Sequence, residues 1–191
     1  MGGATPSQTV GPFFSLGLDT FPCELVAADD AGALRVEGVV LDGAGEPVPD
    51  ALVEVWQANV HGRYAHPGDR RDELPLFESF AGFGRCLTDG AGRYRFRTVK
   101  PGSVPFGDGR LQAPHVAVGV FARGLLKRLA TRMYFPDEEV ANAADPVLSA
   151  LGDDARRTLV ARPTGGGVRF DIRLQGARQT TFFAMPAEGG S

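Results

Sequence analysis

The stretch that decides the interpretation of this chain is Gln112–Gly124, which reads Gln-Ala-Pro-His-Val-Ala-Val-Gly-Val-Phe-Ala-Arg-Gly. Its apolar part, His115–Ala122, is rich in valine and follows a proline, which predicts a strand. Side chains two residues apart share one face of a strand, so His115 and Ala117 lie side by side. The stretch therefore predicts a strand in which His115 is able to bind a metal, while Ala117 beside it has no donor atom.

Length and composition indicate an ordinary globular protein. The chain has 191 residues, of which 43% are hydrophobic and 23% charged, enough for one domain that buries a core without disulfides or metals. A formal net charge of -3 gives no basic stripe for a nucleic-acid backbone. The 26 glycines and 14 prolines interrupt the chain at short intervals, which favours short strands joined by turns.

The N-terminal sequence predicts neither export nor a membrane anchor. No basic residue precedes Arg35, and no apolar run there has the length of a signal peptide. The longest apolar run, Val116–Ala122, is too short to span a bilayer. We therefore expect a cytoplasmic protein. Cys23 and Cys86 are then expected to be reduced, packed thiols, with a disulfide as the alternative.

Alternation of apolar and polar residues predicts an all-β protein with little helix. A helical segment is plausible only within residues 137–162, and Arg85–Thr98 has the pattern of a hairpin with its turn at residues 89–92. Further strands are expected at Leu34–Asp42, Ala51–Trp56, Arg128–Phe135 and Val168–Leu174. We expect residues 1–191 to form one β-sandwich domain, with an extended N-terminal arm over residues 1–20 and the sandwich over residues 34–183.

Candidate metal ligands are few. Tyr64 and His115 suit a ferric ion, because a phenolate oxygen and an imidazole fit it better than they fit a soft metal. Two protein ligands seldom hold such an ion, so the alternative is a packed tyrosine and a hydrogen-bonded core histidine. A second possible cluster is His61, Tyr64 and His66 in a polar loop. The chain has neither a phosphate-binding glycine loop nor a Gly-x-Ser-x-Gly nucleophile motif.

Arg123 is the second candidate, because its guanidinium ends an apolar strand and suits a carboxylate. The alternative is a strand-end arginine that reaches solvent. Eight residues of strand separate Arg123 from His115 by roughly 26 Å, so the two belong to different sites. The N-terminal Thr5–Phe14 carries two adjacent aromatic residues, which pack either on the same domain or on a partner.

Several longer motifs occur in order over most of the chain. Through them the chain resembles the α subunits of the protocatechuate 3,4-dioxygenases, which belong to the intradiol ring-cleaving dioxygenase family. The stretches that carry the resemblance are Thr-Pro-Ser-Gln-Thr-Val-Gly-Pro-Phe (5–13), Glu-Val-Trp-Gln-Ala-Asn (54–59), Thr-Asp-Gly-Ala-Gly-Arg-Tyr-Arg-Phe-Arg-Thr-Val-Lys-Pro-Gly (88–102), Ala-Pro-His-Val (113–116), Phe-Ala-Arg-Gly-Leu (121–125), Thr-Arg-Met-Tyr-Phe (131–135) and Arg-Phe-Asp-Ile-Arg-Leu-Gln-Gly (169–176).

The resemblance implies a site that has lost its iron ligands. In this family two tyrosines and two histidines hold Fe(III), and the matching positions here are Tyr64, Val104, His115 and Ala117. Two of the four donors are therefore replaced by hydrocarbon. The resemblance implies that this chain binds no metal, and that Fe(III) is held by a homologous β subunit. The two subunits would form an αβ heterodimer that assembles into a larger oligomer.

The resemblance also assigns residues to the partner's substrate pocket. Thr9, Gly11, Pro12, Phe13 and Arg123 would face the substrate, with Arg123 near its carboxylate, and Phe13 stands where tyrosine is common. The implied reaction is O₂-dependent cleavage of protocatechuate to 3-carboxy-cis,cis-muconate, with the isolated chain inactive. A non-catalytic β-sandwich binding or scaffold module is the alternative, because a fold alone does not fix function. An independent metal enzyme is disfavoured by the missing ligands.

Overall fold

The computed structural model describes residues 8–11, 14 and 22–184, and most of its regular structure is strand. The strands in this part of the chain are β1 (Ala33–Leu41), β2 (Leu52–Trp56), β3 (Phe83–Leu87), β4 (Arg93–Val99), β5 (Val104–Pro105), β6 (Leu111–Gln112), β7 (His115–Phe121), β8 (Leu129–Tyr134), β9 (Arg162–Thr164), β10 (Gly167–Arg169) and β11 (Ile172–Arg173).

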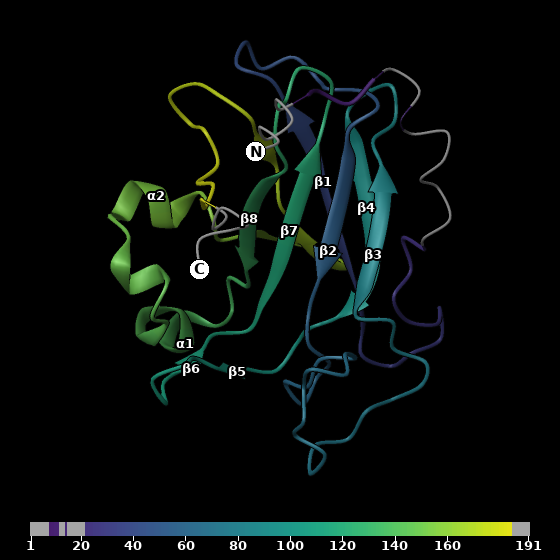
Figure 1. Ribbon diagram of the computed structural model, residues 1–191, viewed down its shortest axis with the longest axis vertical. Coiled ribbons are helices and arrows are strands. Elements are labelled where there is room, and N and C mark those ends of the chain that lie inside the picture. Colours follow the sequence, from purple (N-terminus) through teal and green to yellow (C-terminus); the bar gives the residue numbers. More distant parts are fainter. Residues whose placement is uncertain (1–7, 12–13, 15–21, 185–191) are drawn as a thin grey trace, which may run out of the picture.

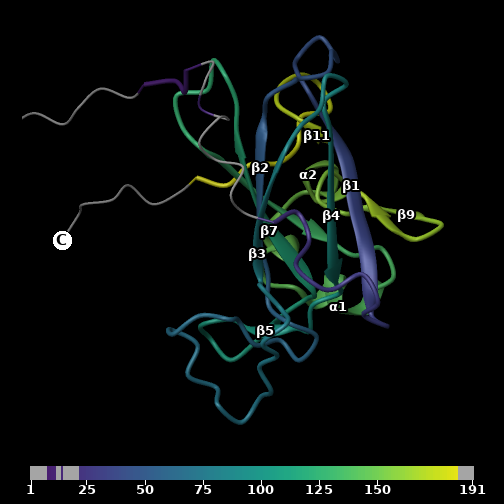
Figure 2. The ribbon, with the colours of Figure 1, turned by 90° about the vertical axis from the view of Figure 1, so that its right-hand side faces the viewer.

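Two sheets form the two layers of a sandwich (Figures 1 and 2). One sheet has the order β3-β2-β7-β8, with antiparallel neighbours throughout. In the other sheet β1 pairs antiparallel with β4, and parallel with β10 and then β11 along its length. The remaining pair, β5 and β6, forms a small separate ladder. The predicted all-β sandwich is thus confirmed.

The core lies between the two inner faces. Every second residue of β1 points inward, as Val36 and Val40 do, while residues between them are less buried. The opposite sheet supplies the other half of the core, which includes Val53, Val118 and Met133. Burial of this apolar surface is the main force that holds the two sheets together.

Two details of the predicted strands are wrong. The turn at residues 89–92 exists, but β3 pairs with β2 and β4 pairs with β1, so Arg85–Thr98 passes from one sheet to the other and is no hairpin. The expected strand Val168–Leu174 is divided into β10 and β11. Between them the side chain of Asp171 accepts a hydrogen bond from the Val39 N–H, which replaces a ladder contact.

The predicted helical region contains short helices only: α1 (Glu139–Ala144), a 3₁₀ turn (Leu148–Ala150) and α2 (Asp153–Arg157). They lie beside β8 (Figure 1) and enclose a second small core with Tyr134 and Leu159. Asp145 is fully buried there and accepts hydrogen bonds from the N–H groups of Ala113 and Leu148. Within the described ranges, no helix has the length and apolar character needed to cross a membrane.

The ends of β7 are covered by different parts of the chain. At its first residue, the long β2–β3 connection and the β5–β6 ladder lie together at one end of the sandwich (Figure 2). At its last residue, the turn that follows meets residues 8–11 of the arm at the opposite end (Figure 1). The strand therefore joins two separate surfaces, and each carries candidate residues predicted from the sequence.

Candidate functional site

His115 is the first residue of β7, and its side chain contacts other residues of the same chain. Its side chain is buried, its Nδ1 lies 2.8 Å from the carbonyl oxygen of Ala113, and its ring centroid lies 5.6 Å from that of Tyr134. Burial, together with the nearby guanidinium of Arg132, lowers the pKa of His115 to about 4. The imidazole is therefore neutral at physiological pH and has the geometry of a hydrogen-bonded core histidine.

Tyr64 reaches the same end of the sandwich from the β2–β3 connection. Its N–H donates to Asp69 Oδ2 at 2.8 Å, which fixes the loop, and its ring stacks on Trp56 with centroids 5.9 Å apart. Burial raises the pKa of Tyr64, while Arg132 and Arg71 oppose that shift. Tyr64 and Val104 line one cavity of about 570 Å³. The structure thus brings these two predicted positions together.

Arg132 is the residue of this site that the sequence did not reveal. It is the cross-strand partner of Ala117 in the β7–β8 ladder, and its Nη1 donates to Gln112 Oε1 at 2.7 Å. Its charge acts on the pKa of both Tyr64 and His115, so the guanidinium lies close to both side chains. Only the register of two strands identifies Arg132 as part of this site, and a single sequence gives no such register.

The donor set at this end does not fit a ferric ion. Tyr64 and His115 offer one phenol and one imidazole, while Val104 and Ala117 offer only hydrocarbon, and a fixed cation lies close by. Across residues 8–11, 14 and 22–184 there is no group of three His, Cys, Asp or Glu side chains able to hold a metal. His61 and His66 pack instead against aromatic rings, those of Phe77 and Trp56.

The other end of β7 presents an accessible cation. The Arg123 side chain is 53% exposed, and its Nη2 lies 3.4 Å from Asp50 Oδ2 in a loose ion pair. Arg123 lines a cavity of about 650 Å³ together with apolar residues such as Pro49 and Leu174. A guanidinium in this setting is able to bind a carboxylate without losing a strong internal partner.

Residue Thr9 of the N-terminal arm docks beside Arg123. Thr9 Oγ1 accepts a hydrogen bond of 2.8 Å from the N–H of Gly124, whose φ of 86° makes the turn after β7. Val10 lies over an apolar hollow that includes Phe121 and Leu125. Thr9 and Arg123 are thus adjacent and lie far along β7 from His115. Gly11 follows in the arm, and Pro12 and Phe13 lie outside the described residues.

Comparison with known proteins decides the family. A family model described as Dioxygenase matches residues 19–176. The protocatechuate 3,4-dioxygenase alpha chain of Pseudomonas putida is 40% identical over 197 residues, which cover 94% of this chain and 95% of that protein. The chain belongs to the intradiol ring-cleaving dioxygenase family. This result confirms the resemblance inferred from the sequence motifs.

Relatives of both subunit types exist within this dioxygenase family. The alpha chain of Burkholderia cepacia is 41% identical over 94% of this chain, and the beta chain of the same organism is 42% identical over 76% of this chain and 65% of its own length. The match to alpha chains therefore extends over more of both proteins. This dioxygenase chain is similar in sequence to both halves of a heteromeric enzyme.

Solved structures support the dioxygenase fold. The dioxygenase domain of a carbohydrate-binding fusion protein from Streptomyces sp. SirexAA-E is 28% identical and superposes with a TM-score of 0.57 over 91% of this chain and 99% of that one. Hydroxyquinol 1,2-dioxygenase from Pseudomonas putida DLL-E4 gives a TM-score of 0.61 at 21% identity, over 89% and 66% of the two chains. The second likeness concerns the fold alone.

Proposed function

We propose that this chain is the non-iron-binding α subunit of a heteromeric protocatechuate 3,4-dioxygenase, in which it shapes the substrate pocket of an iron-bearing β subunit. Two observations together carry the proposal. The chain is similar to alpha chains over nearly its full length, and Val104 and Ala117, at two positions that match iron ligands of the family, have no donor atom. A chain that kept the fold while losing two ligands is suited to assist a partner.

The contribution of this chain is proposed to be orientation of the substrate. The exposed guanidinium of Arg123 would pair with the carboxylate of protocatechuate, which fixes the position of the ring relative to the partner's iron. Thr9, which is bonded to the N–H of Gly124, and the residues Gly11, Pro12 and Phe13 that follow in the arm would form part of the wall. Positioning and charge pairing of this kind account for a few kcal/mol of a reaction barrier.

We propose that the partner subunit catalyses the opening of the ring. Fe(III) in the β subunit would supply activation of the bound catecholate toward O₂, giving 3-carboxy-cis,cis-muconate. The side chains of this chain contribute binding and orientation only. In this arrangement residues 1–191 act as one domain of an αβ heterodimer that assembles further, in the cytoplasm.

Co-expression with a β subunit tests the proposal. The isolated chain is expected to be colourless and inactive, and the co-purified complex is expected to be red-brown, from tyrosinate-to-iron charge transfer, and to cleave protocatechuate. Ring cleavage by the isolated chain at the rate of the complex would contradict the proposal. Failure to co-purify with any β subunit would favour a binding or scaffold module on the same fold.

A further inference from the structure

The two cysteines of the chain, 63 positions apart, meet at one edge of the sandwich. Cys23 lies in a segment that runs alongside β4, and the N–H of Arg97 in β4 donates to the Cys23 carbonyl oxygen at 3.0 Å. The Cys23 thiol donates to the carbonyl oxygen of Arg85 at 3.2 Å, and Cys86 is the next residue in β3. Each thiol is the largest influence on the pKa of the other, so the two side chains lie close together. They therefore form a pair held by two strands.

The backbone of β4 directs a further donor at Cys86. Along the edge of β4 that faces away from β1, the N–H of Arg93 donates to Asp89 Oδ1 at 2.9 Å and the N–H of Arg97 donates to Cys23. Arg95 lies between these two residues, and its backbone N–H lowers the pKa of the Cys86 thiol. A thiolate accepts a hydrogen bond more strongly than a thiol does.

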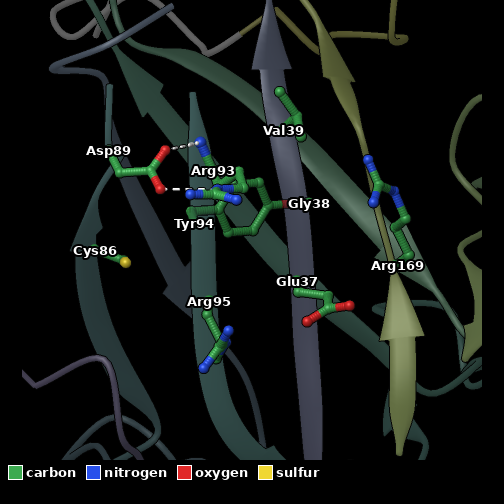
Figure 3. Close-up of a pocket in the computed structure, with 9 residues that line it drawn as sticks. All are labelled: Glu37, Gly38, Val39, Cys86, Asp89, Arg93, Tyr94, Arg95 and Arg169. Atoms are coloured by element: carbon green, nitrogen blue, oxygen red, sulfur yellow. Dashed lines mark hydrogen bonds and ion pairs between the residues drawn. The ribbon is translucent and has the colours of Figure 1, made fainter. Parts of the chain in front are cut away.

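Cys86 also opens into a cavity. It lines a hollow of about 460 Å³ together with three arginines and two carboxylates, which are Arg93, Arg95, Arg169, Glu37 and Asp89. Figure 3 shows the Cys86 sulfur directed toward the strand that carries Arg95. Arg93 is paired with Asp89, and Arg169 is paired with Asp171. No ion pair joins the Arg95 guanidinium to another residue within the described ranges. Arg95 is therefore the cation available to an incoming anion near the sulfur.

The two thiols differ in acidity. The neighbouring Cys23 side chain is the main influence on Cys86, and together with Arg95 it lowers the pKa of Cys86 to about 7 although burial opposes this. The same contact raises the pKa of Cys23 far above its usual range. Of the two cysteines, Cys86 lines the cavity and Cys23 does not, so an incoming disulfide meets Cys86 first. The thiolate is the reactive form of a cysteine, and the lowered pKa favours it at Cys86.

We propose that Cys86 and Cys23 form a redox-active dithiol, in which Cys86 attacks an anionic low-molecular-weight disulfide received beside Arg95 and Cys23 resolves the product. In the first step the Cys86 thiolate bonds to one sulfur of the small disulfide, and the other sulfur leaves as a thiolate. Cys23 then loses its proton to solvent and attacks the Cys86 sulfur, which releases the second small thiolate. The protein is oxidised by two electrons, and the small disulfide is reduced to two thiols.

Oxidised glutathione, added to the full-length reduced chain, tests the order of the two thiols by intact mass and peptide mapping. We expect Cys23→Ser to retain one glutathionyl group on Cys86, and Cys86→Ser to acquire none. The unchanged chain should lose two hydrogens and link the two cysteine peptides, without a lasting adduct. Labelling of Cys23 in Cys86→Ser as fast as that of Cys86 in Cys23→Ser would overturn the proposal, and so would unreactive thiols in the folded chain. Alanine variants of both cysteines repeat the test if a serine variant fails to fold.

The role of charge is tested with Arg95→Ala in the Cys23→Ser background. We expect the adduct with oxidised glutathione to form roughly tenfold more slowly, while cystamine, a cationic disulfide, reacts at least as fast as before. Arg157→Ala is the matched control, because Arg157 is an exposed arginine on α2 remote from the cavity. Equal slowing with both disulfides would contradict an anion-receiving cavity, and so would equal effects of Arg95→Ala and Arg157→Ala.

Discussion

The two ends of β7 have opposite properties. At the first end His115 is buried and hydrogen-bonded to a carbonyl oxygen, and the guanidinium of Arg132 lies near both His115 and Tyr64. At the second end the guanidinium of Arg123 is half exposed and held only by a 3.4 Å ion pair. One cation is thus part of an internal network, and the other is available to a ligand.

Under the proposed function, loss of metal ligands at one end of the strand and loss of ligand binding at the other are separate events. Val104 and Ala117 carry no donor atom, and Val104 is buried, so it serves packing. The exposed side chains at the other end contribute little to packing. Substitutions at the first end should therefore change stability, and substitutions at the second end should change ligand binding.

The largest expected effect is a pH dependence of stability at the first end. The unfolded chain protonates His115 near pH 6.5 and the folded chain only near pH 4, so this residue lowers the free energy of unfolding as pH falls from 6.5 to 4, by about 3 kcal/mol in full. Urea unfolding across this range should show a smaller loss in His115→Gln, in which no ring protonates. Parallel pH profiles for the two proteins would contradict a buried neutral imidazole.

The next effect concerns the second end. In the complex with a β subunit, Arg123→Ala should raise KM for protocatechuate about thirtyfold, because a charged hydrogen-bonded contact of roughly 2 kcal/mol is lost. The KM for unsubstituted catechol, which has no carboxylate, should change little. Arg110→Ala is the control, since Arg110 is equally exposed at the opposite end. Equal changes in KM for both substrates would contradict the proposal that Arg123 binds the carboxylate of the substrate.

The smallest effect is expected at the docked arm. Thr9→Val keeps the shape of the side chain but loses the bond from the Gly124 N–H, which is worth about 1 kcal/mol. We expect faster proteolysis within the arm and an increase of a few-fold in KM for protocatechuate. Thr164→Val, on the exposed strand β9, should change neither. If Thr9→Val changes neither the rate of proteolysis within the arm nor the KM for protocatechuate, this contact does not position the arm.

Local sequence patterns predicted much of the fold, because alternation and turn residues act within a few positions. They placed the strands near residues 33–41, 52–56, 115–121 and 129–134. They failed where the choice of partner decides the result, as between β3 and β4, which join different sheets. The place of Arg132 beside Ala117 and the proximity of Cys23 to Cys86 were missed for the same reason, because each depends on contacts between residues distant in sequence.

Iron stoichiometry tests the central claim most directly. The chain should be purified alone and with a β subunit, and the iron in each sample measured against protein by atomic absorption. We predict no stoichiometric iron in the chain alone and about one iron ion per pair of subunits in the complex. The reason is that only Tyr64 and His115 offer a donor atom among the four positions that match the family's iron ligands. Stoichiometric iron in the isolated chain, or about two ions per pair, would contradict the account.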